Sequence, residues 1–160
     1  MPEFEAKDET RNLSDIIIEH LGIKSETIDI SPILTACGCY QKRDDAIREI
    51  YPEYGTGYLN KIVISHPNAK GSIRYFKLVI QAPSGAIKKK RLTASSYLKI
   101  LSATNFKQRV RKMLEYHYAD LYNYAVIGTP NRQEYDQGFF VKGGDGLADI
   151  KNIAHLYKTQ

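Results

Sequence analysis

Residue types that bind nucleotides are concentrated in the last quarter of the chain. Thr129 directly follows the apolar stretch 125–128, and Glu134 lies five residues further on. Lys142 then precedes a run of glycines, and Asp149 ends the same loop. Glycines let a backbone approach a phosphate, lysines neutralise its charge, and carboxylates hold Mg²⁺. These types at this spacing indicate a site for a nucleotide and a magnesium ion.

Each side chain also has an ordinary structural explanation. Glu134 fits an exposed loop, Lys142 fits a surface position beside a turn, and Asp149 fits a helix N-cap or a turn. Lys158 is expected to open a last helix, where a solvated lysine is common. Arg109 is either solvated or within reach of an anion. Only the combination of these residues points to chemistry.

Two predicted elements position this stretch. Apolar residues at helical spacing predict a helix over 105–122, with Arg109, Arg111 and Lys112 off the apolar stripe. Residues 124–128 predict a buried strand. Ligands of open α/β sheets bind at the carboxyl ends of strands, and residues 129–134 are expected at such an end.

The rest of the chain alternates between helix and strand, which predicts the α/β class. The predicted elements are a helix over 13–21 ended by Gly22, a strand over 26–30, short helices within 32–51, a strand over 61–64, a hairpin formed by 73–80 and 86–92, and a helix over 94–103. Because the hairpin interrupts helical stretches, residues 52–103 are interpreted as an insertion in a single domain covering residues 1–160.

Composition excludes several classes of protein. The 160 residues are 42% hydrophobic with a net charge of +5, as in a globular domain. Since no apolar run reaches about 18 residues, no membrane partner is expected. The acidic, polar N-terminus does not resemble a signal peptide, and we expect a cytoplasmic protein.

Two local features have simple interpretations. The basic run Lys88–Arg91 is expected to be a solvated hairpin edge. A nucleic-acid surface would need interleaved aromatics and a second basic cluster, and no nucleic-acid partner is expected. Cys37 and Cys39 are too close for a relaxed disulfide and are expected to be reduced.

Five sequence blocks resemble one family. They are Thr104-Asn-Phe-Lys-Gln-Arg109, Gly128-Thr-Pro-Asn-Arg-Gln-Glu134, Gly138-Phe-Phe-Val-Lys142, Gly144-Asp-Gly-Leu-Ala-Asp149 and Leu156-Tyr-Lys-Thr-Gln160. At this spacing the chain resembles ammonia-dependent NAD⁺ synthetase over residues 104–160. The likeness is weak over residues 52–103.

The resemblance implies a fold, a reaction and site roles. The fold is a doubly wound parallel sheet of the adenine nucleotide α-hydrolase-like type, and the family forms homodimers. The family adenylates deamido-NAD⁺ with Mg-ATP, and ammonia, in some members from a glutaminase domain, then displaces AMP. By resemblance Thr129 and Lys158 contact ATP, Arg109, Lys142 and Asp149 contact deamido-NAD⁺, and Glu134 binds Mg²⁺. No residue is expected to act as a covalent catalyst.

The chain also departs from the family pattern. Pro130 stands where the family usually has glycine and cannot donate a backbone hydrogen bond, and Asn152 stands where proline is common. The family's Ser-Gly-Gly-x-Asp-Ser pyrophosphate loop does not occur in the sequence. The domain is therefore expected to be partial, to be inactive or impaired alone, and to dimerise or aggregate through bare apolar surface. Two alternative functions remain open. The chain is a related ligase that acts on another carboxylate, or it is a non-catalytic module for nucleotide binding or dimerisation.

Overall fold

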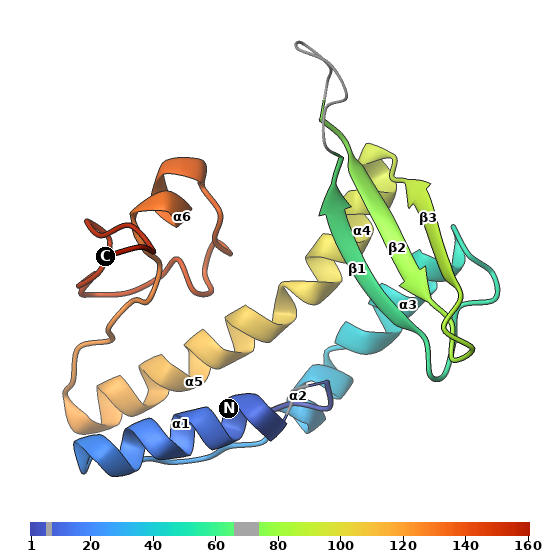
Figure 1. Cartoon of the computed structure of the whole chain (residues 1–160). Coiled ribbons are helices and arrows are strands. Elements are labelled where there is room, and N and C mark those ends of the chain that lie inside the picture. The colour runs from blue at the N-terminus through green and yellow to red at the C-terminus, as the bar shows by residue number, and fades with distance from the viewer. Residues whose placement is uncertain (6–7, 66–73) are drawn as a thin grey trace. The chain divides into compact units, whose positions relative to one another are not determined.

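The computed structural model describes the backbone of residues 1–5, 8–65 and 74–160, and the side chains of the same residues except 8–11. Its elements, labelled in Figure 1, are α1 (Asp8–Leu21), α2 (Ser31–Ala36), α3 (Cys39–Arg48), β1 (Leu59–Ile64), β2 (Phe76–Gln81), β3 (Ile87–Arg91), α4 (Ala94–Thr104), α5 (Phe106–Tyr122) and α6 (Arg132–Gln137). The chain divides into two compact units, residues 38–104 and residues 1–37 with 105–160.

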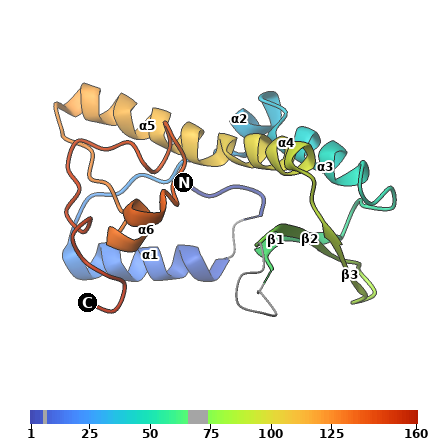
Figure 2. The same ribbon diagram turned by 90° about the horizontal axis from the view of Figure 1, so that it is seen from above.

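The unit of residues 38–104 is a three-stranded antiparallel sheet with two helices. The strand order is β1-β2-β3, and Val79 of β2 lies between Lys61 of β1 and Lys89 of β3 in the register. Leu78 and Ile80 point to the other face, where they form a core with Ile47, Ile100 and four further buried side chains (Ala46, Tyr51, Tyr54 and Leu92). α3 and α4 therefore cover one face of the sheet (Figure 2).

The predicted hairpin is present in this unit. β2 and β3 pair antiparallel, and their connection turns at Gly85, whose φ of 85° favours glycine. Residue 73, the first of the predicted strand, lies outside the described residues. β3 is an edge strand whose five residues are all exposed, which confirms the basic run as a solvated hairpin edge.

The two cysteines form no disulfide, as expected. Gly38 stands between them with a φ of 69° and is the N-cap residue of α3. The Cys39 thiol is buried and contacts the carbonyl oxygen of Ala103 at 3.2 Å. This contact joins the beginning of α3 to the end of α4.

The other unit contains the predicted helices over 13–21 and 105–122, observed as α1 and α5. The burial of α5 differs from the expected apolar stripe. Lys112 is only 5% exposed, whereas Met113 and Leu121 are 57% and 61% exposed. The placement of Lys112 off the buried side was therefore wrong, because within this unit the N-terminal residues and the segment after α5 pack on its polar side.

Two predicted strands of this unit were wrong. Residues 26–30 form no strand, and residues 124–128 contribute only an isolated parallel bridge between Ile127 and Ile150. A strand needs a neighbouring strand to satisfy its N–H and C=O groups. In the described part of the chain, neither segment has a neighbouring strand beyond that bridge. Tyr124 is exposed, so the segment is only partly buried.

The end of the chain was also predicted incorrectly. Residues 157–160 form a turn closed by the Gln160 N–H on the Tyr157 carbonyl, so Lys158 opens no helix. The loop after Thr129 instead contains the short helix α6. The observed class is α/β with an antiparallel sheet. No helix among the described residues is both long and apolar enough to cross a membrane.

Candidate functional site

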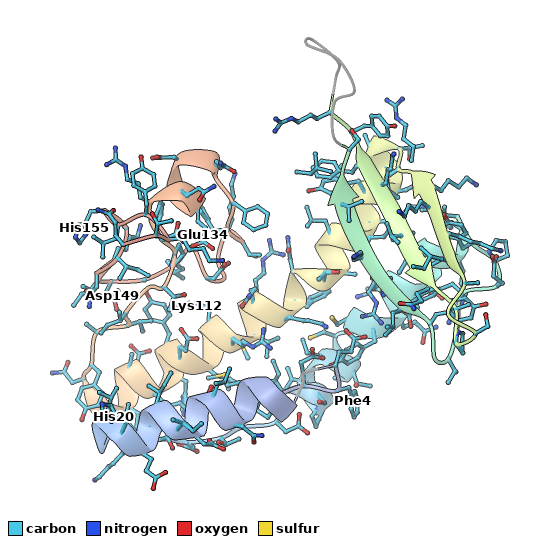
Figure 3. The ribbon with its side chains drawn as sticks, in the orientation of Figure 1. Phe4, His20, Lys112, Glu134, Asp149 and His155 are labelled. Carbon is cyan, nitrogen blue, oxygen red and sulfur yellow. The ribbon has the colours of Figure 1, made fainter. Side chains whose placement is uncertain are left out.

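All six residues predicted for the site lie in the unit of residues 1–37 and 105–160. Arg109 is on α5, Glu134 is on α6, and the other four lie in the segments that flank α6. Figure 3 shows Glu134 and Asp149 in the C-terminal part of this unit, and Lys112 on α5. No two of these six side chains are joined to each other by a hydrogen bond or an ion pair.

Asp149 connects three segments of the unit. Its Oδ1 accepts a hydrogen bond from the Tyr116 hydroxyl of α5 at 3.1 Å, and its Oδ2 accepts one from the Val126 N–H at 2.8 Å. Burial, and then this hydrogen bond, raise the pKa of Tyr116. Asp149 therefore holds the loop against α5 and against the segment that leads to Thr129.

Arg109 contacts the backbone next to the glycine run. Its Nε donates to the Lys142 carbonyl oxygen at 3.1 Å, while the Lys142 side chain is exposed. The structure thus brings these two predicted residues together at one edge of the loop. Both side chains carry positive charge, which suits an anionic ligand.

Three glycines of this loop occupy positions that do not suit a larger side chain. A Cβ atom on Gly144 would lie 2.8 Å from the Gln108 Cβ atom, and one on Gly146 would overlap the Phe140 ring. Gly143 has a φ of 69°. The Val141 N–H donates to Asp145 Oδ1 at 2.7 Å and closes the turn. Gly144 therefore lets the loop pack closely on α5, and Gly146 leaves room for the Phe140 ring.

Glu134 belongs to a capping box at the start of α6. Its Oε2 accepts from the Asn131 N–H at 2.8 Å, and its own N–H donates to Asn131 Oδ1 at 3.1 Å. Such reciprocal bonds satisfy two backbone donors that a helix N-terminus leaves without partners. Oε1 has no hydrogen-bond or ion-pair partner among the described residues, so one oxygen is available to a cation.

Lys158 lies in the terminal turn beside α6. The Arg132 N–H donates to the Leu156 carbonyl at 2.9 Å, and the Arg132 guanidinium lies 5.1 Å from the centre of the Tyr157 ring. These contacts hold the turn at the start of α6, while the Lys158 side chain is exposed.

A cavity of about 250 Å³ contains one predicted residue, Thr129. Sequence reasoning missed its other lining residues, which are Gln108, Arg111, Lys112, Glu115, Ile127 and Asp145. Inside this cavity the buried Lys112 ammonium pairs with Glu115 Oε2 at 2.5 Å. The signal that could have found them is a polar stripe, because residues 108, 111, 112 and 115 have the spacing of one helix face.

The arrangement offers cations and hydrogen-bonding groups rather than a metal cage. Among the described residues, no group of three or more His, Cys, Asp or Glu side chains could hold a metal. Mg²⁺ in nucleotide sites is usually held by one or two carboxylates together with substrate phosphates. A single carboxylate with an available oxygen, as in Glu134, is compatible with that mode.

Comparison with known proteins places the chain in a family. The family model of NAD synthase matches residues 68–160, which is more than half of the chain. The chain therefore belongs to the NAD synthase family.

Similar proteins align with the whole of this chain, whereas this chain covers only part of each relative. The NH(3)-dependent NAD(+) synthetase of Rhizobium meliloti (strain 1021) is 51% identical over 160 residues, which are 100% of this chain and 48% of the relative. That of Mesorhizobium japonicum is 46% identical over 100% of this chain and 50% of the relative. The chain spans about half the length of these curated relatives.

A solved structure shares the fold. It is the NMN synthetase from Francisella tularensis, and the match covers 99% of this chain and 44% of the synthetase chain. The TM-score is 0.57 and the sequence identity is 23%. This likeness concerns the fold alone. The alignments with the relatives run through residues 52–103, so this segment is not peculiar to the present chain.

Proposed function

We propose that this chain is part of an ammonia-dependent ligase that converts deamido-NAD⁺ to NAD⁺. The observation that carries the proposal is the 51% identity over all 160 residues to a protein named NH(3)-dependent NAD(+) synthetase. The sequence blocks of residues 104–160 and the cationic edge formed by Arg109 and Lys142 support it.

The proposed reaction has two steps. A carboxylate oxygen of deamido-NAD⁺ attacks the α-phosphorus of ATP, and pyrophosphate leaves. Ammonia then attacks the acyl carbon, the bond to the AMP oxygen breaks, and the new amide loses a proton. Cations must hold the developing charge, and the acyl-adenylate must be shielded from water.

The proposed roles follow from charge and position. Arg109 and Lys142 hold the anionic dinucleotide at the edge of the loop, and Asp149 contacts the same substrate while fixing the loop on α5. Thr129 and Lys158 contact ATP. Pro130 has no N–H to donate to that nucleotide.

Glu134 is the proposed ligand of Mg²⁺. Its Oε2 is used in the capping box, which fixes the side chain and presents Oε1. When bound, Mg²⁺ would offset the negative charge of the triphosphate. We place no other ligand for it in this chain.

The larger assembly belongs to the same proposal. We propose a doubly wound parallel sheet for the whole domain, and the parallel bridge between Ile127 and Ile150 supports it. We also propose a homodimer in the cytoplasm, with ammonia supplied free or by a glutaminase. Residues 52–103 remain predicted to be an insertion in that sheet.

A chimera tests the function of this chain. The 160 residues replace the matching segment of the Rhizobium meliloti relative, and NAD⁺ formation is measured with deamido-NAD⁺, Mg-ATP and ammonium chloride. ATP–pyrophosphate exchange reports the first step separately. We expect both activities, because the segments match without a large change in length.

The outcomes separate the alternatives. A folded chimera that exchanges pyrophosphate with another carboxylate, but not with deamido-NAD⁺, favours the related ligase. A folded chimera without exchange for any carboxylate favours a non-catalytic module. The unsubstituted relative is the positive control for every assay.

A further inference from the structure

Charge is strongly segregated along this chain. No Asp or Glu occurs from residue 54 to residue 114, a stretch that holds thirteen Lys and Arg residues. The unit of residues 38–104 contains twelve Lys and Arg and only four Asp and Glu. This unit therefore carries a net charge of +8, whereas the whole chain carries +5.

The four carboxylates of this unit are all used in ion pairs. Two pair within α3 with neighbouring arginines. Glu49 pairs with Lys99 at 2.7 Å, and Glu53 pairs with Lys88 at 2.6 Å. Among the described residues, none is left to neutralise the remaining cations of the sheet.

Four of those cations gather on the face of the sheet opposite α3 and α4. Directly paired residues of neighbouring strands point to the same face. In the register, Val79 lies between Lys61 on β1 and Lys89 on β3. Lys77 on β2 lies opposite Arg91 on β3. The face that carries Leu78 and Ile80 belongs to the core, so these four cations lie on the other face.

One aromatic ring makes cation–π contacts with two of the four cations. The Lys77 ammonium lies 5.2 Å and the Arg91 guanidinium 4.6 Å from the centre of the Tyr75 ring. The pairing of Lys77 with Arg91 places like charges directly opposite each other, which destabilises a sheet. A bound anion would relieve this repulsion.

We propose that this face, defined by Lys61, Tyr75, Lys77, Lys89 and Arg91, binds nucleic acid through its phosphate backbone. Neighbouring strands lie about 4.8 Å apart, so the backbones at Lys61 and Lys89 are about 10 Å apart and several phosphates can be contacted together. Lysine is depleted in protein–protein interfaces, and three of the four cations are lysines. The chemistry therefore favours a polyphosphate over an acidic protein.

The tertiary structure supplies what the sequence lacked for this interpretation. On this face Lys89 and Arg91 of the basic run are joined by a second set of cations, Lys61 and Lys77, and by the aromatic Tyr75. The proposal is independent of the ligase function, because the six residues proposed for the ligase lie in the other unit.

The test is binding of the full chain to a fluorescein-labelled 20-nucleotide oligothymidylate, followed by fluorescence anisotropy at several salt concentrations. We expect micromolar binding at 50 mM KCl, with log Kd rising by about 3 per decade of salt if four phosphates are contacted. The double variant Lys61→Gln/Lys89→Gln should weaken binding by at least about tenfold and lower the salt slope by about 1.4. A 20-base-pair duplex provides a second arm.

The matched control is Lys88→Gln/Lys99→Gln, which removes the same number of charges from lysines that are paired with Glu53 and Glu49. We expect its Kd to change less than about threefold, and both double variants to keep the parent circular dichroism spectrum. Equal weakening in both double variants would show that only net charge matters and would overturn the proposal. It is also overturned by absence of binding at 50 mM KCl, or by polyglutamate or anionic vesicles competing as well as the oligonucleotide.

Discussion

At the scale of single residues, Glu134 combines a structural and a proposed chemical role that substitutions can separate. Glutamine preserves a capping box but carries no charge. In the chimera we expect Glu134→Gln to keep the melting temperature within about 2 °C. NAD⁺ formation should fall by at least about tenfold, as for loss of other metal-site groups.

Asn131→Ala is the matched control for this experiment. It removes the other half of the capping box and should lower the free energy of unfolding by about 1 kcal/mol. Its loss of NAD⁺ formation should be smaller than that of Glu134→Gln. A Glu134→Gln chimera as active as the parent would rule out the proposed magnesium role.

The hydrogen bond between Tyr116 and Asp149 makes a prediction about pH. Burial and then this bond raise the pKa of Tyr116, so the folded chain favours the neutral phenol. That stabilisation is complete below the unfolded pKa of about 10 and is lost as the pH rises through the folded pKa. We expect Asp149→Asn to lower the pKa of Tyr116, as measured by ¹³C NMR titration of the tyrosine rings.

Tyr118 is the internal control for that titration. Its pKa is raised first by the hydrogen bond to Glu26, which is independent of Asp149. Asp149→Asn should leave the Tyr118 titration unchanged, and Glu26→Gln should shift Tyr118 alone. A Tyr116 pKa that does not respond to Asp149→Asn would contradict the assigned contact.

The residues of the candidate site could be predicted from the sequence better than their hydrogen-bond and ion-pair partners could. The spacing of Glu134, Lys142 and Asp149 indicated a polar site, but the two hydrogen bonds of Asp149 depend on Tyr116 and Val126, which are far away in the sequence. Lys112 was missed because hydropathy assigns lysine to solvent, whereas an ion pair with Glu115 allows its burial.

At the scale of elements, the close contact between the glycine loop and α5 can be tested at Gly144. A methyl group there would meet the Cβ atoms of Gln108 and Val141, which cannot move without their backbones. We expect Gly144→Ala to lower the free energy of unfolding by about 1–3 kcal/mol in urea titrations. Gly55→Ala, where a Cβ meets open space, should have little effect; similar values for both would contradict the packing.

Helices were predicted better than strands in this chain. A helix satisfies its backbone hydrogen bonds within one segment, and the helical periodicity of 105–122 therefore matched α5 closely. A strand depends on a neighbour that the local sequence does not reveal. The hairpin was found because both of its strands and their turn are consecutive, whereas the segments 26–30 and 124–128 were assigned to strands wrongly.

At the scale of the molecule, the unit of residues 38–104 has a core of its own. We expect this fragment to fold alone and to give dispersed amide signals in an NMR spectrum. Ile47 is fully buried, so Ile47→Ala should destabilise the fragment by about 2–5 kcal/mol. The exposed Ile87 is the control, and Ile87→Ala should be neutral; an unstructured fragment would contradict a separate core.

The apolar stripe of α1 makes a prediction about association. Leu13, Ile16 and Ile17 are 57–62% exposed, which is unusual for a contiguous apolar stripe. We expect the chain to self-associate in light scattering, and the triple substitution of these residues by serine to shift it toward the monomer. Ile23→Ser, which lies outside the helix, should not shift the chain toward the monomer. A monodisperse monomer of the unsubstituted chain would contradict association through the α1 stripe.

The sequence by itself determined the helices α1 to α5, the hairpin and the family, because local periodicity, turn residues and contiguous motifs carry that information along the chain. Only the tertiary structure decided that Lys112 is buried, that Asp149 joins three segments, and that cations from three strands share one face with Tyr75. These properties arise from strand register and from packing between segments distant in sequence, and no local pattern specifies either.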